Sequence, residues 1–317
     1  MRKIDFHVHI NCPIPIEKTV ENFKDMAQRF GYEGVGIMAL NVSSCGLDPE
    51  CNARAIALKR RMPGSYAFAA LDHGRDFLIQ AEEYRRAGFD GIKLLEGKPS
   101  LYRYYGYGLE NERFDAFFAY AEREQLPILL HNCDPALHWD ITRLDDRAKR
   151  LGWYYDASMP PQDFFSRTLE QVLEKYPALR LTVAHLGFYA DRLEIAARLL
   201  ERCPNLYFDI TPALIIYTQL SENADAPAFF RKYGDRLIYG TDAENDLTGF
   251  ARAYNDKKVQ IITSFLEKEE TCEVEGVLIH PIAAEQELLR KIYAENALRF
   301  IMETPWSAEG PAAENRL

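Results

Sequence analysis

The chain alternates between short apolar runs and longer amphipathic stretches, and this alternation limits the possible folds more than any other feature. Eight apolar runs have the length of a buried β-strand. They cover residues 4–10, 34–40, 66–71, 91–95, 127–131, 181–185, 206–210 and 237–240. The helical patterns cover residues 16–30, 49–61, 77–87, 111–124, 161–176, 189–202 and 226–233, and residues 288–301 close the series. Strands that alternate with helices in this way indicate parallel β/α units.

Eight such units predict an α/β fold, a (β/α)8 TIM barrel with long loops at the C-terminal face of the strands. No glycine-rich GxGxxG follows a strand, so the usual nucleotide-binding signature of an open doubly wound sheet is missing. Residues 96–110 and 132–160 are too long for plain turns, and loops of this length are typical of lids or binding loops. We expect one domain over residues 1–304 and a loose C-terminal tail over residues 305–317.

Charge and hydropathy narrow the class of partner. The formal net charge is −10, and no basic run interrupts it, which argues against nucleic acid and favours a small-molecule substrate. No apolar segment is long enough to span a membrane, and the first residues lack the apolar core of a signal peptide, so we expect a cytoplasmic protein. The outer helices and residues 287–301 would form the face of a possible homodimer.

The cysteines are scattered singly, without a CxxC pair or a zinc-knuckle spacing, and we expect reduced thiols. They are Cys12, Cys45, Cys51, Cys133, Cys203 and Cys272. Cys133 follows His131 by two residues and borders the expected site, but a buried packing role is the more ordinary reading.

The first apolar run carries His7 and His9, two residues apart. Because side chains alternate along a strand, both histidines would point to one side and bind one ion together. Ile4, Phe6, Val8 and Ile10 have the opposite parity, so we expect them to pack outward against helices. The pair therefore has the form of half a metal site.

Other ionisable residues recur at or near the ends of the predicted strands: Lys93, His131, His185 and Asp242. A buried neutral imidazole needs hydrogen-bond partners, so histidines would not end apolar strands repeatedly for packing alone. Since the carboxyl ends of barrel strands meet at one face, we expect these side chains to converge at the barrel mouth.

These motifs resemble those of the amidohydrolase superfamily, and in particular its amidohydrolase-related branch, which includes aminocarboxymuconate-semialdehyde and resorcylate-type decarboxylases as well as metal-dependent hydrolases. The matching segments are Asp5-Phe6-His7-Val8-His9, Gly91-Ile92-Lys93-Leu94, His131, Ala184-His185-Leu186-Gly187, Gly240-Thr241-Asp242 and Asn296-Ala297-Leu298-Arg299-Phe300. Together these segments extend over nearly the whole chain.

The resemblance implies a divalent metal, zinc or another such as Mn, Fe or Co, bound by His7, His9, His131 and Asp242. Imidazoles with one carboxylate and an open position are how catalytic zinc sites are built. The resemblance makes His185 a ligand of a second metal or a catalytic group that polarises the substrate, and makes Asp242 the group that accepts the proton of the metal-activated water and passes it to the leaving group.

Lys93 has three readings: a cation that contacts a substrate carboxylate, a carboxylated lysine that bridges two metals, or a member of a structural ion pair. Glu96 would join the substrate site if the chain turns there. Arg103, His138 and Trp139 are substrate-contact candidates because they lie in the long loops. Among the remaining histidines, we expect His73 to cap a helix, and His280 is a candidate for the border of the pocket.

The leading hypothesis is a metal-dependent hydrolase of a small carboxylate-bearing substrate, cleaving a C–N or C–O bond with metal-activated water. A nonoxidative metal-dependent decarboxylase with the same site is the first alternative. A non-catalytic barrel that binds a metal or ligand is another. A TatD-like phosphoesterase also opens with HxH, but it would carry glutamate where Lys93 stands and would act on nucleic acid, against the net charge of −10.

Overall fold

The central feature of the fold is one parallel sheet of nine strands, in the order β10-β9-β8-β7-β6-β5-β2-β1-β11. The computed structural model describes residues 1–308 except residues 12, 44–45 and 145. The strands are β1 (Ile4–His9), β2 (Gly34–Met38), β5 (Tyr66–Ala70), β6 (Gly91–Gly97), β7 (Ile128–Asn132), β8 (Leu181–Val183), β9 (Leu206–Asp209), β10 (Leu237–Ile238) and β11 (Ala243–Glu244). Each of the eight predicted strands is present, with ends that shift by one or two residues.

The sheet closes into a barrel because its two edge strands, β10 and β11, belong to one segment of chain, residues 237–244. Strand β10 pairs with β9, and β11 pairs with β1. Between them, the amide of Phe6 donates to the carbonyl of Tyr239 at 3.1 Å, and the amide of Asp242 donates to the carbonyl of His7 at 2.8 Å. The segment therefore serves as the eighth barrel strand, and the predicted TIM barrel is confirmed.

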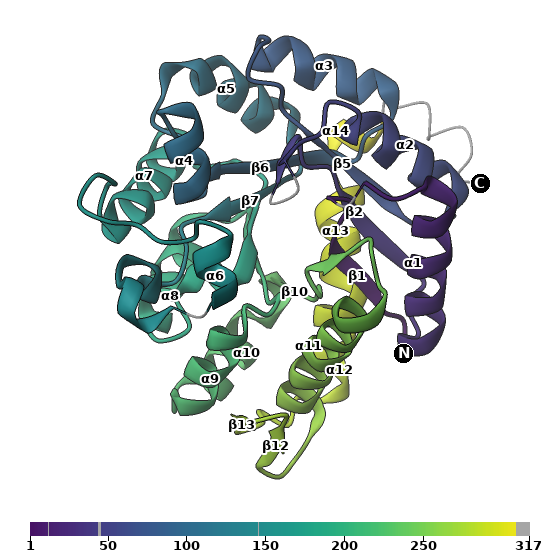
Figure 1. Ribbon diagram of the computed structural model, residues 1–317, viewed down its shortest axis with the longest axis vertical. Helices are drawn as coiled ribbons and strands as arrows, with labels where there is room; N and C mark the ends of the chain where they lie inside the picture. The colour runs from purple at the N-terminus through teal and green to yellow at the C-terminus, as the bar shows by residue number, and fades with distance from the viewer. Residues whose placement is uncertain (12, 44–45, 145, 309–317) are drawn as a thin grey trace.

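Helices surround the barrel (Figure 1). The predicted helices are present as α1 (Ile16–Phe30), α2 (Cys51–Arg61), α3 (Phe77–Ala87), α5 (Asp115–Glu124), α7 (Gln162–Lys175), α8 (Leu193–Arg202) and α10 (Ala226–Tyr233). The closing pattern is split into α12 (Gln286–Arg290), a π-helical segment η6 (Lys291–Glu295) and α13 (Asn296–Met302).

Several elements lie in segments where no helix or strand was predicted. The long loops contain α4 (Pro99–Tyr105) and α6 (Asp146–Arg150), and α9 (Leu214–Glu222) follows β9. The 19-residue helix α11 (Gly249–Glu267) follows β11. Short antiparallel hairpins are formed by β3 (Val42–Ser43) with β4 (Gly46–Leu47), and by β12 (Cys272–Val274) with β13 (Val277–Ile279).

The expected outward packing of every even-numbered residue in the first strand is wrong. The register of β1 against β2 shifts between Asp5 and Val8, and this irregularity changes which residues face the barrel. Ile4 and Phe6 lie in the inner core, where the Phe6 ring is 5.5 Å from that of Phe68. Val8 packs in the outer core, as predicted. Phe6, the residue directly before His7, thus also faces the barrel interior.

Helix α13 places apolar side chains against the inner core, with the ring of Phe300 5.8 Å from that of Phe6. This contact occupies the end of the barrel away from the histidines. Apolar side chains therefore fill one end of the barrel interior, and the histidines lie at the other end.

The C-terminal segment differs from the expected loose tail at its start. Residues 305–308 form α14 (Pro305–Ala308), and Trp306 is 1% exposed. Its indole Nε1 donates to the carbonyl of Phe89 at 3.0 Å, which ties the segment to the barrel. Residues 309–317 lie outside the described residues.

No helix among the described residues combines the length and the apolar character needed to cross a bilayer. Cys51, Cys133, Cys203 and Cys272 are free thiols, whereas Cys12 and Cys45 lie outside the described residues.

Candidate metal and active site

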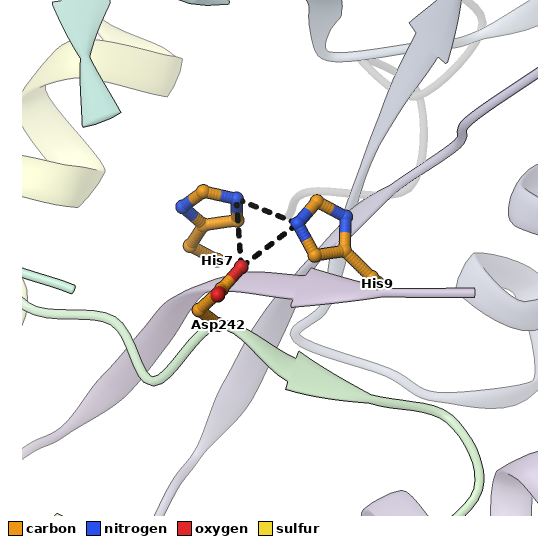
Figure 2. A group of neighbouring side chains, drawn as sticks. All are labelled: His7, His9 and Asp242. Atoms are coloured by element: carbon orange, nitrogen blue, oxygen red, sulfur yellow. Dashed lines mark hydrogen bonds and ion pairs between the residues drawn. The ribbon is translucent and has the colours of Figure 1, made fainter. Parts of the chain in front are cut away.

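Three ligating side chains meet at the mouth of the barrel: His7 and His9 from β1, and Asp242 from the segment between β10 and β11 (Figure 2). The Nε2 atoms of His7 and His9 are 3.1 Å apart. The Oδ1 atom of Asp242 is 2.9 Å from Nε2 of His9 and 3.7 Å from Nε2 of His7. The sequence-predicted pair and the predicted carboxylate are therefore brought within reach of one ion.

The orientation of His7 is set by Asp209 at the end of β9. The Oδ2 atom of Asp209 lies 2.8 Å from Nδ1 of His7, and both side chains are fully buried. Burial and the neighbouring Lys93 charge lower the pKa of His7 to about 3, so the ring is neutral near pH 7. With its proton on Nδ1, shared with the carboxylate, His7 directs the lone pair of Nε2 toward His9 and Asp242.

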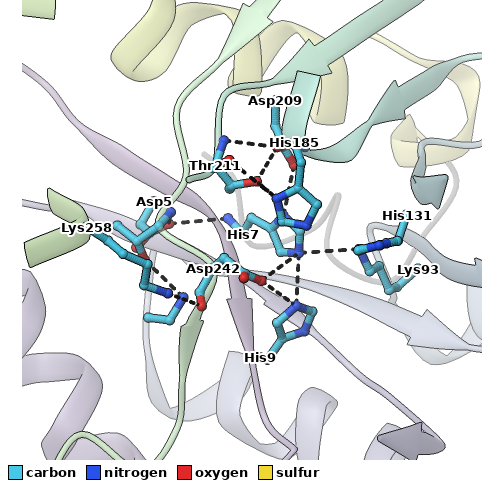
Figure 3. Close-up of polar contacts among 12 residues, drawn as sticks. Asp5, His7, His9, Lys93, His131, His185, Asp209, Thr211, Asp242 and Lys258 are labelled. Carbon is cyan, nitrogen blue, oxygen red and sulfur yellow. Dashed lines mark hydrogen bonds and ion pairs between the residues drawn. The ribbon is translucent and has the colours of Figure 1, made fainter. Parts of the chain in front are cut away.

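Asp5 fixes the chain segment that carries Asp242. Its carboxylate accepts hydrogen bonds from the amide and hydroxyl of Thr241 at 2.9 and 2.6 Å. The Nζ atom of Lys258 on α11 donates to the carbonyl of Asp242 at 2.5 Å (Figure 3). Asp242 itself has a φ of 55°, a strained value for a residue with a side chain. These contacts hold the Asp242 carboxylate toward the histidines.

His185 follows β8 in a segment with left-handed backbone geometry, with φ of 56°. Its Nδ1 is 2.8 Å from Oγ1 of Thr211, and its amide donates to Oδ1 of Asp209 at 2.8 Å. Burial lowers the pKa of His185 below its ordinary value. Asp209 therefore supports two histidines of the site at once, and Nε2 of His185 is the ring nitrogen left for the cavity.

His131, at the end of β7, lies beside this group, and its ring centroid is 4.9 Å from that of His185. Its Nε2 atom, however, lies 3.2 Å from Oδ1 of Asp134 and 3.3 Å from Nζ of Lys98. Lys98 and Asp134 form a close ion pair at 2.6 Å. The structure thus places the predicted fourth ligand next to the three-residue group but turned toward a neighbouring pair.

Lys93 extends from β6 into the barrel interior and is 2% exposed. Its Nζ is 3.3 Å from Nε2 of His7. Burial lowers the pKa of Lys93 to about 8, which makes an appreciable part of the amine neutral at physiological pH. Lys93 is not among the residues that line the cavity described next, and His7 is its contact within the site.

A cavity of about 680 Å³ opens above the site. His9, His131, His185 and Asp242 line it, together with Lys98, Lys258 and aromatic side chains. Of the predicted substrate contacts, His138 lines the cavity, whereas Arg103, Trp139 and Glu96 do not. The Arg103 guanidinium instead donates to the carbonyls of Gly152 and Tyr154, and the Trp139 indole donates to the carbonyl of Pro160.

Glu96 is buried against His73, with Oε1 2.8 Å from Nε2 of the histidine. His73 also stacks on Tyr105 at 3.5 Å, and the side chain that caps helix α3 is Asp76, so the expected capping role of His73 is wrong. His280 is exposed on the turn after β13 and is not among the residues that line the cavity.

Asp209, Asp134, Lys98 and Lys258 are the residues of the site that the sequence reasoning missed. Asp209 could have been predicted as a site residue, because it lies near the carboxyl end of the predicted strand 206–210. Lys98 and Asp134 stand at the starts of the two long loops. Lys258 was missed together with its helix α11, which was not predicted.

The model of the protein family described as Amidohydrolase matches residues 4–301. No curated protein matches the chain. Among solved structures, the chain is similar to 4-oxalomesaconate hydratase from Rhodopseudomonas palustris, with a TM-score of 0.58 and 15% identity over 94% of this chain and 95% of that chain.

The chain is also similar to 2,6-dihydroxybenzoate decarboxylase from Rhizobium, with a TM-score of 0.54 and 15% identity over 95% of this chain and 98% of that chain. For dihydroorotase from Campylobacter jejuni the TM-score is 0.54 and the identity 12%, over 94% of this chain and 82% of that chain. At such low identity, the likeness shows a shared fold.

Proposed function

Because this chain belongs to the amidohydrolase family, we propose that it is a metal-dependent hydrolase that cleaves a C–N or C–O bond in a small carboxylate-bearing substrate. The observation that carries the proposal is the convergence of His7 Nε2, His9 Nε2 and Asp242 Oδ1, all within 4.8 Å of one another beneath an open cavity.

The donor set fits a divalent metal. The Nε2 atoms of two imidazoles lie 3.1 Å apart beside a carboxylate oxygen. A bound cation would accept the lone pairs of these three atoms and offset the repulsion among them. The Asp209 carboxylate contacts Nδ1 of His7, and metal-bound histidines almost always have such a hydrogen-bond partner on the ring nitrogen that does not bind the metal. Zinc suits these ligands, as do Mn, Fe and Co. A divalent metal bound there would polarise a substrate carbonyl and lower the pKa of water toward neutrality.

Two side chains supply proton transfer and orientation. The Asp242 carboxylate faces the cavity and is the base that takes a proton from the attacking water and returns it to the leaving group. His185, fixed through Nδ1 by Thr211, offers Nε2 to the substrate oxygen. His185 is buried, whereas the Asp242 side chain is 31% exposed at the cavity, where substrate and water can reach its carboxylate.

Lys93 fits the carboxylated reading better than direct contact with substrate, because it is buried and is not among the residues that line the cavity. An ammonium 3.3 Å from His7 Nε2 would also repel a metal at the same nitrogen. The ammonium would first lose one proton, and the neutral amine would then add to CO2 and release a second proton, so that a carbamate anion replaces the repulsive cation. The lowered pKa of Lys93, about 8, favours that step.

The test is elemental analysis of purified protein with activity assays on amides, lactones and esters. We expect bound metal in the wild type, loss of metal in His9→Ala, and retention in His280→Ala, which removes an exposed histidine that does not line the cavity. Two metals per chain, reduced by Lys93→Ala, would support the carbamate. Absence of metal under every loading condition would refute the proposal.

The same assays separate the hydrolase from a decarboxylase with the same site. Hydrolysis products from an amide, lactone or ester support the proposal. Release of CO2 from an aromatic or muconate acid, with all hydrolysable substrates left intact, would replace it with the decarboxylase alternative.

A further inference from the structure

Asp242 offers its carboxylate to the candidate metal site from an unfavourable backbone conformation. Its φ of 55° lies in the left-handed region, where the Cβ atom crowds the carbonyl that follows. Aspartate adopts this region more readily than most residues, but the conformation persists only where surrounding contacts hold it. The peptide before the side chain is held, because the amide of Asp242 donates to the carbonyl of His7 at 2.8 Å. The peptide after it requires a separate contact.

Lys258 on helix α11 supplies that contact. Its Nζ atom donates to the carbonyl of Asp242 at 2.5 Å (Figure 3). Lys258 is only 4% exposed, so water competes little for either partner. A hydrogen bond from an ammonium is about twice as strong as one between neutral groups. The two peptides on either side of the Asp242 side chain are therefore fixed by different parts of the fold, one by β1 and the other by α11.

The Lys258 side chain is itself supported by aromatic rings on its own helix. Phe250, Tyr254 and Lys258 follow one another at intervals of four residues, so they share one face of α11. The Nζ atom of Lys258 is 5.4 Å from the ring centroid of Tyr254. Tyr254 in turn stacks on Phe250, with centroids 5.9 Å apart and an interplanar angle of 15°. A ring beside the ammonium favours one position of a flexible lysine side chain through a cation–π contact.

From these contacts we propose that Lys258 is a positioning residue for Asp242, with Tyr254 as its support, so that helix α11 sets the geometry of the metal site through a backbone contact. The inference rests on the proposed function, because it concerns the metal that His7, His9 and Asp242 would bind. Without the ammonium, the peptide after Asp242 is free to rotate out of the left-handed conformation. The carboxylate then moves from its place 2.9 Å from Nε2 of His9.

The test measures zinc affinity by competition with a chelator, and the visible absorption spectrum of the cobalt-loaded protein, which reports the ligands and geometry of the bound ion. Lys258→Met removes the ammonium and keeps a long side chain. We expect zinc affinity to fall about 10- to 100-fold, the effect typical of groups that hold metal ligands in place, and the cobalt spectrum to change. Lys258→Arg retains a cationic donor and should recover most of the affinity.

Lys257→Met is the matched control. Lys257 also donates from Nζ to a backbone carbonyl, that of Glu275 at 2.9 Å, but it does not line the cavity. This variant should match the wild type in zinc affinity and in cobalt spectrum. Tyr254→Leu should weaken zinc binding less than Lys258→Met does, whereas Tyr254→Phe keeps the ring and should bind zinc as the wild type does.

Wild-type zinc affinity and an unchanged cobalt spectrum in Lys258→Met would overturn the inference and leave the hydrolase proposal standing. Circular dichroism of the metal-free variants checks that each one folds. If Lys258→Met does not fold, the two Tyr254 variants decide, and equal zinc affinity in both overturns the inference. Absence of metal from the wild type under every loading condition is a different result, because it refutes the proposed function and this inference with it.

Discussion

The Oδ2 atom of Asp209 lies 2.8 Å from Nδ1 of His7, with both side chains wholly buried. Burial alone would raise the pKa of the Asp209 carboxyl, but the charge that His7 carries once it is protonated in acid, together with its hydrogen bond, holds that pKa below its ordinary range. The carboxylate therefore selects the tautomer in which Nε2 of His7 is the lone-pair nitrogen, and it links β9 to β1 beneath the site.

Asp209→Asn removes this charge while nearly preserving shape. We expect metal affinity to fall about 10- to 100-fold, since partners behind ligating histidines carry effects of that size. Competition titration of zinc against a chelator measures the change. Asp191→Asn, at an exposed carboxylate paired with Arg192, is the control and should bind zinc normally. Wild-type affinity in Asp209→Asn would show that the tautomer of His7 does not govern binding.

The metal-free protein should lose stability as the pH falls from about 7 to about 4. His7 has a folded pKa of about 3 against about 6.5 when unfolded. Below about pH 6.5 the unfolded chain binds a proton on His7 that the folded chain does not bind, so the free energy of unfolding falls as the pH decreases toward the folded pKa. Burial lowers the pKa values of His131 and His185 in the same direction.

Asp5 opposes this effect, because burial raises its pKa to about 7 and the folded state keeps a proton that the unfolded state has lost. Three histidines outweigh one aspartate, so we still expect the melting temperature to decrease with acidification. His185→Asn should flatten the dependence, and His280→Asn, at an exposed histidine, should not. A melting temperature that is constant or rises toward acid would contradict the argument.

Trp306→Ala should destabilise the protein by about 3–5 kcal/mol, the usual cost of emptying a buried tryptophan site. The indole is 1% exposed and donates to the carbonyl of Phe89. Urea denaturation measures the change. Ile79→Ala removes an apolar side chain that is 52% exposed and should change stability little. Equal stability in the two variants would mean that α14 does not contribute to the folded core.

Cys51 should resist alkylation in the folded protein. Burial, followed by the Asp48 charge, raises the pKa of its thiol to about 12, and the thiolate is the reactive species. Its thiolate fraction near pH 8 is therefore about a ten-thousandth. Cys272, on the partly exposed hairpin strand β12, should react much faster. Site-resolved mass spectrometry after iodoacetamide treatment compares the two, and similar rates would refute the expectation.

The alternation of apolar runs and helical patterns was sufficient to predict the barrel, because strand and helix periods are local properties of the chain. The same locality identified His7, His9 and Asp242, since residues at strand ends of a parallel barrel gather at one face. The same reasoning could have predicted Asp209, which lies near the carboxyl end of a predicted strand. The helical periodicity of residues 249–267 was present in the sequence too, and its buried face includes Ile262 and Phe265.

Other features depended on contacts between distant segments. The register shift in β1, which turns Ile4 and Phe6 inward, arises from pairing with β2 and has no local signal. Trp306 is buried because it packs near Phe89, whose carbonyl accepts a hydrogen bond from its indole. The cavity likewise brings together Tyr104 on α4 and Phe250 on α11, which are far apart in the chain.

The sequence by itself determined the barrel and the types of residue at its mouth, because both follow from short-range patterns. Only the tertiary structure decided how those residues are used. It turned His131 toward Asp134 and Lys98, placed Lys93 beside His7, and set Asp209 at Nδ1 of His7. Each of these outcomes depends on angles and distances between strands that no single segment encodes.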